Sequence, residues 1–277
     1  MFLWDEVTAK RGANEICSCI HKFVNTFVPL DVCKLFIFSD NCSGQNKNLT
    51  LIIFYLTLIH SKRFKEITHI YFTTGHTYMA ADRDFALIEK NMRRHSYIFT
   101  PNEHKEIIKS TKSSETPFQV VDMQQGDFKD FDSLKQYVTR RNPTRLRFID
   151  ACYFRVSHNN KNGYVCDNTY TSLREGCGEY VRLAKGSNLD PSFNLFQYNV
   201  PRKYERLIPL SKAKSDDLKV LVRDLVPPYI QRTYWDAILD MTAEPNGRCN
   251  HHVDNTETDG QDIDEENVSE GDFYDYD

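Results

Sequence analysis

The sequence lacks the features that mark a membrane-spanning or secreted protein. Its longest apolar run, from Leu49 to Ile59, is far shorter than the roughly 20 residues that a transmembrane helix needs. The N-terminus has acidic residues early and lacks the apolar stretch that forms the centre of a signal peptide. We therefore expect an intracellular protein without membrane attachment.

The eight cysteines are not arranged as a redox or zinc site. No pair has the C-x-x-C spacing of a zinc knuckle or a dithiol motif. Cys17 and Cys19 are two residues apart on a predicted helix, so their side chains point in different directions. Scattered thiols of this kind are typical of reduced cysteines in intracellular proteins.

Basic residues are missing from the C-terminal end of the chain. Residues 251–277 contain eleven Asp or Glu and no Lys or Arg. Such a segment cannot bury enough apolar surface to fold, so we expect residues 247–277 to form a disordered acidic tail. The chain without residues 251–277 has 28 acidic and 35 basic residues, a formal charge of +7 that permits a polyanionic partner.

The residues that are present indicate an α/β fold. Apolar residues at helical spacing predict a helix over residues 16–27, which Pro29 ends. The run KLFIFS (34–39) predicts a buried strand, an apolar helix over 48–61 follows, and ITHIYFT (67–73) predicts a second strand. This strand–helix order is typical of a parallel α/β sheet.

The pattern changes near the middle of the chain. A helix over residues 82–94, and another that begins with the capping box of Thr100 and Glu103, complete an α/β unit over residues 1–142. Short strand-like runs and then two helices follow. They predict a β-rich appendage, closed by helices, over residues 143–246.

Acidic residues near the predicted strand ends are candidates for a metal site. Asp40 follows the first strand, and α/β sheets place their active sites at the carboxyl ends of parallel strands. The second strand leads to His76, and Asp82 opens the next helix. Carboxylates suit Mg²⁺ and Mn²⁺, so we expect Asp40 and Asp82 as metal ligands, with His76 as an assisting ligand or proton carrier. The alternative is structural: Asp40 caps a turn and Asp82 caps its helix.

Polar and basic residues beside these acids indicate a nucleic-acid partner. Gln45 and Lys47 follow Asp40 in the same loop, where they can contact a phosphate backbone. Arg145 and Arg147 belong to a stretch that mixes arginine with aromatic residues, as grooves for nucleic acid do. Hydrogen bonds within the loop, and charged edge strands, are the alternative explanations.

Three segments together resemble a family abundant in arthropod genomes and classed as a domain of unknown function. The segments are WDEVTAKRGANEICSC (4–19), SDNCSGQNKN (39–48) and GHTYMAADRDFALIEK (75–90). The likeness extends to about residue 241. The resemblance implies a ribonuclease H-like core of transposase descent, DNA as the nucleic acid, and residence in the nucleus. It also permits an oligomer, because transposase-like enzymes often act as multimers.

The resemblance also assigns roles to residues. Asp40 matches the second acid of the ribonuclease H-like site, and His76 with Asp82 is similar to the His–Asp ending of Holliday-junction resolvases. The order of elements makes MFLWDE (1–6) the third strand of the core, so we expect the first two strands and the first acid to lie before Met1. The implied function is transposase- or nuclease-like phosphoryl transfer with Mg²⁺ or Mn²⁺, in a truncated or inactive form. The alternative is a non-catalytic module that binds nucleic acid or protein.

The enzyme hypothesis predicts that the chain cleaves a labelled oligonucleotide when Mg²⁺ or Mn²⁺ is added. Asp40→Ala should abolish cleavage, because a bridging metal ligand is lost. Gel analysis of the products measures this. Binding of the oligonucleotide without cleavage in the presence of Mg²⁺ or Mn²⁺ would support the non-catalytic binding module instead.

Overall fold

The structure is a computed structural model that describes residues 1–42, 44–73, 79–112, 117–138, 146–160, 162–183 and 199–239. Its main sheet has five strands in the order β2–β3–β5–β6–β7, of which β2 and β3 are parallel and the other neighbours antiparallel. The bounds are β2 Lys34–Ser39, β3 Glu66–Tyr71, β5 Tyr153–Ser157, β6 Gly163–Asp167 and β7 Glu179–Arg182.

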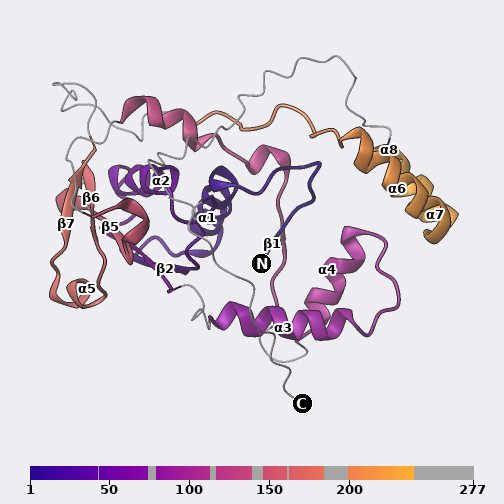
Figure 1. Cartoon of the computed structure of the whole chain (residues 1–277), viewed down its shortest axis with the longest axis horizontal. Helices are drawn as coiled ribbons and strands as arrows, with labels where there is room; N and C mark the ends of the chain where they lie inside the picture. The colour runs from indigo at the N-terminus through magenta and orange to yellow at the C-terminus, as the bar shows by residue number, and fades with distance from the viewer. Residues whose placement is uncertain are drawn as a thin grey trace, which may run out of the picture.

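Two helices lie on one side of this sheet. α1 spans Ala13–Phe27 and α2 spans Leu49–His60, and Figure 1 shows them beside the strands. α2 packs against β3 and β5 and also against α1, so it is apolar on nearly all sides. Its Phe54 ring meets the ring of Phe131 edge-on at 4.8 Å. Phe131 begins a 3-10 helix, Phe131–Tyr137, which packs against both α1 and α2 and adds Phe131 and Leu134 to this core.

The short helix α5 lies beside the sheet, and the other remaining helices lie apart from this core (Figure 1). α3 and α4 pack as a pair, and α6 and α8 pack against the π-helical turn between them. The bounds are α3 Ala80–Met92, α4 Pro101–Ser110, α5 Thr171–Glu175, α6 Lys212–Leu225, α7 Pro228–Ile230, the π turn Gln231–Trp235 and α8 Asp236–Leu239. Two short strands, β1 Phe2–Leu3 and β4 Val121–Asp122, form a separate parallel pair.

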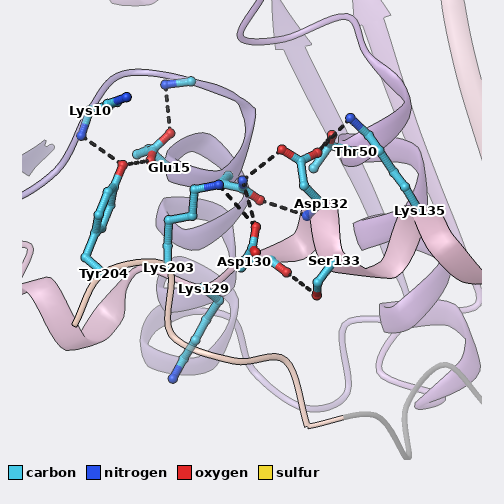
Figure 2. A network of polar contacts seen from close by, with 12 residues as sticks. Lys10, Glu15, Thr50, Lys129, Asp130, Asp132, Ser133, Lys135, Lys203 and Tyr204 are labelled. Atoms are coloured by element: carbon cyan, nitrogen blue, oxygen red, sulfur yellow. Dashed lines mark hydrogen bonds and ion pairs between the residues drawn. The ribbon is translucent and has the colours of Figure 1, made fainter. Parts of the chain in front are cut away.

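A polar network links α1 and α2 to the 3-10 helix (Figure 2). The buried Asn14 amide donates to Asp130 at 3.2 Å and to Asp132 at 3.0 Å, and its oxygen accepts the backbone N–H of Asp132 at 3.1 Å. Thr50 on α2 also donates to Asp132. Burial alone would raise the pKa of Asp132, but hydrogen bonds from Lys135 and Thr50 outweigh this and hold the pKa below its usual value. The network therefore favours the ionised carboxylate.

The start of α1 is tied to the chain that follows the sheet. The buried Glu15 carboxylate accepts the backbone N–H of Gly12 at 2.8 Å and the hydroxyl of Tyr204. The same hydroxyl accepts the backbone N–H of Lys10 at 3.1 Å, as Figure 2 shows. These bonds satisfy donors at the helix N-terminus and hold residues far apart in sequence together.

Most of the predicted helices and strands are confirmed with small shifts. The mixed α/β class is confirmed, and KLFIFS and ITHIYFT form neighbouring parallel strands. The capping box of Thr100 and Glu103 is present. The acidic tail lies outside the described residues.

Two expectations were wrong. KLFIFS is not a buried strand: in the described sheet it is the outer strand β2, and its alternate residues are exposed. The parallel pairing predicted for the first two strand–helix units is present in β2 and β3, and β5 then adds antiparallel to β3. MFLWDE supplies no strand to the main sheet, since β1 pairs only with β4 in the described structure.

The sheet also crosses the predicted boundary after residue 142. Strands β5, β6 and β7 come from the predicted appendage, yet they share one core with α2 and β3. A pattern of short strands shows local structure but not which strand is the neighbour of which. The two predicted units thus contribute to a single sheet. In the described ranges, no helix combines the length and apolar character that crossing a bilayer requires.

Gly163 on β6 leaves no room for a side chain. A Cβ added there would lie 2.1 Å from the backbone oxygen of Val181 on β7. Gly163→Ala should therefore lower the free energy of unfolding by about 1–3 kcal/mol, through strand displacement. At Gly44 an added Cβ meets no described atom within 4 Å, so Gly44→Ala is the matched control. Urea unfolding of both variants measures the difference, and equal midpoints would contradict the close approach of β6 and β7.

Candidate nucleic-acid interface

Asp40 lies at the carboxyl end of β2, as the sequence predicts. Its side chain is exposed, and Oδ1 accepts the backbone N–H of Cys42 at 3.3 Å and the side-chain amide of Asn46 at 2.6 Å. These contacts close the loop that leads into α2. The turn-capping role is therefore present in the structure, and the exposed carboxylate stays a candidate metal ligand.

Asp82 lies at the third position of α3. Its Oδ2 accepts the backbone N–H of Met79 at 2.8 Å, which makes it part of the helix start. His76, the expected proton carrier, falls outside the described residues, as does Arg145. Among the residues that the structure describes, no group of three or more His, Cys, Asp or Glu side chains could hold a metal ion. Asp40 and Asp82 thus remain metal ligands by prediction only.

Three residues predicted to contact nucleic acid have different surroundings. Lys47 is buried: its ammonium donates to the carbonyl of Ile149 and lies 5.2 Å from the centre of the Tyr71 ring. Burial lowers the pKa of Lys47. Gln45 is partly exposed, and Arg147 is exposed but paired at 2.7 Å with Asp150.

A buried histidine beside this loop was missed from the sequence. His69 on β3 lies with Nε2 2.8 Å from the Ser39 hydroxyl and with Nδ1 2.9 Å from the Tyr55 hydroxyl and 3.1 Å from that of Tyr71. The Tyr71 hydroxyl donates to the carbonyl of Asn46 at 2.8 Å, which connects the loop to the core. Burial lowers the pKa of His69 to about 3. A histidine within an apolar strand gives no sequence signal of this role.

The side of the sheet opposite α2 carries exposed aromatic rings. Alternate residues of a strand face opposite sides, so Leu35 and Ile37 pack into the core while Phe36 and Phe38 point away from it. Both phenylalanines are 54% exposed. The ring of Phe72, just beyond β3, stacks on that of Phe38 with centroids 5.9 Å apart. An exposed row of rings on a regular strand is unusual for a surface that faces only water.

Two cationic residues share this side of the sheet. Lys34 is on β2 and pairs with Glu66 at 3.4 Å. The strand register places Phe36 next to Thr68 on β3, and Thr68 next to Arg155 on β5. The Arg155 guanidinium donates to two backbone carbonyls of the segment after α5. We call the surface formed by Lys34, Phe36, Phe38, Phe72 and Arg155 the open sheet face.

The fold and this face define an α/β domain with a helix layer on one side of its sheet and exposed aromatic rings on the other. The chain belongs to the family described as Domain of unknown function (DUF7869), which matches residues 1–168. The match includes β2, β3, β5 and β6 and also covers all five residues of the open sheet face. No curated protein and no solved structure shows significant similarity to the chain.

The low pKa of His69 predicts acid sensitivity. The folded chain keeps His69 neutral down to about pH 3, whereas the unfolded chain binds a proton near the ordinary value of 6.5. The free energy of unfolding should therefore fall, by up to about 1.4 kcal/mol per pH unit, as the pH drops from 6.5 to 5. Urea unfolding at several pH values measures this slope.

His69→Gln should flatten the slope. A smaller dependence should remain, because burial also lowers the pKa of His21. His95→Gln, which changes an exposed histidine, is the matched control. A slope that His69→Gln does not change would show that His69 is protonated in the folded chain.

Proposed function

We propose that the chain binds single-stranded nucleic acid on the open sheet face. The observation that carries the proposal is that Phe36 and Phe38 are both more than half exposed on the same side of one strand. Alternate strand residues are about 6.6 Å apart, and each ring offers an apolar face on which a base can stack. Stacking does not depend on base identity, so we expect little sequence preference.

Charge supports the same partner. Lys34 and Arg155 flank the phenylalanines, where cations can pair with backbone phosphates. The formal charge of +7 outside residues 251–277 has the sign that attracts a polyanion. Aromatic rings interleaved with cations on a sheet are a recurrent surface for single strands. Of the predicted partners, nucleic acid is therefore the one that this surface favours.

Metal-dependent cleavage of the bound strand is the second function that we propose. Its support is the position of Asp40, whose exposed carboxylate follows β2 only two residues beyond Phe38. Asp40 and Asp82 would be ligands of Mg²⁺ or Mn²⁺ in a ribonuclease H-like core of transposase descent, acting on DNA in the nucleus. The hydrogen bonds from Cys42 and Asn46 both end on Oδ1 of Asp40, so Oδ2 would be the oxygen that binds the ion.

Phe36→Ala and Phe38→Ala should each weaken binding of a fluorescein-labelled single strand. Loss of one stacked base costs about 1–3 kcal/mol, or roughly a 5- to 150-fold rise in the dissociation constant. Fluorescence anisotropy at low salt measures the constant for DNA and RNA oligonucleotides. Lys34→Ala should reduce the slope of log affinity against log salt by about 1.

Phe85→Ala is the matched control, because it removes a ring that is 61% exposed on α3, away from the open sheet face. It should bind as the unaltered chain does. Equal losses for all three phenylalanine variants, or no binding at low salt, would reject the proposed interface. Product analysis with Mg²⁺ or Mn²⁺ in the same reactions tests cleavage separately from binding.

A further inference from the structure

On the outer edge of β2, the residues that the structure describes provide no backbone partner. β2 ends the strand order of the described sheet, with β3 as its neighbour on the inner side. The carbonyls of Cys33 and Ser39 accept N–H groups of Lys65 at 2.7 Å and Phe72 at 3.0 Å, so the odd-numbered residues bond toward β3. Successive residues direct their backbone groups to opposite edges of a strand. The N–H and C=O groups of residues 34, 36 and 38 therefore face outward.

This edge has little protection against another strand. Sheet edges are usually blocked by proline, a bulge or inward charges, because an open edge pairs with other chains. β2 is a six-residue strand without proline, and its one charge, Lys34, is at its first position. In the described part of the chain, no other strand or bridge covers the edge. The edge can therefore accept a further strand over the length of KLFIFS.

We propose that this further strand is β2 of a second copy of the chain, paired antiparallel. If the two-fold axis is perpendicular to the sheet, the open sheet faces of both copies lie on the same side. Even-numbered residues of one β2 must then lie opposite even-numbered residues of the other, and odd-numbered opposite odd-numbered. The register centred on Ile37 meets this requirement. It places Phe36 opposite Phe38 of the partner subunit, and Lys34 opposite Asp40 of the partner subunit.

Charge complementarity favours this register and favours a second copy of the chain as the partner. The Lys34–Asp40 pair occurs twice across the axis, and both side chains are exposed. Opposite charges and aromatic rings that face each other across antiparallel strands stabilise the pairing. The outward backbone groups of Phe36 and Phe38 meet in this register as hydrogen-bonded pairs. The strand β2, together with Asp40 directly after it, is thus complementary to a second copy of itself in charge, in side chains and in backbone bonding.

The dimer does not rest on the proposed nucleic-acid function. It follows from the open edge and from the charges at the two ends of β2. The two functions are compatible, because the rings of Phe36 and Phe38 stay on the open sheet face. The pairing would join two such faces into one surface.

Sedimentation velocity of the whole chain without nucleic acid tests the proposal. We expect a monomer–dimer equilibrium that shifts with concentration. Lys34→Glu and Asp40→Lys should each raise the dimer dissociation constant at least tenfold, because each creates two like-charge pairs. Lys219→Glu, which reverses an exposed charge on α6, is the control and should leave the constant unchanged.

An equimolar mixture of the Lys34→Glu and Asp40→Lys variants should dimerise again. In the mixed dimer, the carboxylate introduced at position 34 of one subunit faces the ammonium introduced at position 40 of the other. The second pair across the axis is the unaltered Lys34 with the unaltered Asp40. Both pairs are then of opposite charge, so the affinity should return toward that of the unaltered chain.

Disulfide trapping provides a test that keeps residues 34 and 40 unchanged. Ile37 lies on the axis as a non-hydrogen-bonded pair, where the Cα atoms are about 4.5 Å apart and a disulfide fits. Ile37→Cys should give a covalent dimer on oxidation, in a background where the exposed Cys33, Cys42 and Cys177 are changed to serine. The same background without Ile37→Cys is the control. A monomer at all concentrations, or a mixture of the charge variants that stays monomeric, would overturn the proposal, whatever the result of the nucleic-acid assay.

Discussion

The burial of α2 is the interaction on which the rest of the structure depends. The helix packs against β3 and β5 and also against α1, and its residues from Leu51 to Leu56 are almost completely buried. Each large apolar side chain buried in this way contributes about 1.5–3 kcal/mol. Thr50 adds a hydrogen bond to Asp132. One helix therefore holds together strands from both halves of the chain.

On the other side of β2, no helix among the described residues covers the strand, and Phe36 and Phe38 are exposed there. The helix α2 makes one side of β2 and β3 the inner side, so every second residue of β2 turns outward. The polar network of Asn14, Asp130 and Asp132 strengthens the covered side and adds nothing to the other. The packing of the core on one side of β2 is thus enough to place the aromatic rings of the candidate interface on the other side.

The acidic residues show how structural and chemical roles overlap. Asp40 holds the loop before α2, and Asp82 holds the start of α3, each with backbone or amide donors. A carboxylate that caps a turn is held in a fixed position, which is also what a metal ligand needs. Lys47 differs, because it is buried and its ammonium donates a hydrogen bond to the carbonyl of Ile149. The family match covers all three residues without assigning a function to them.

The local helices and strands, and the polar residues of the loop before α2, could be predicted from the sequence alone. Periodicity and capping located α1, α2, β2, β3 and α4, because these signals depend on neighbours three or four residues away or on alternation along a strand. The sequence did not determine the sheet order, the edge position of β2 or the environment of His69, which depend on contacts between distant segments. Phe36 and Phe38 look like core residues in the sequence, since apolar character is the same in a central and an outer strand. Their exposure follows from the strand order, because β5 pairs with β3 on the side away from β2, and β2 is therefore the outer strand of the described sheet.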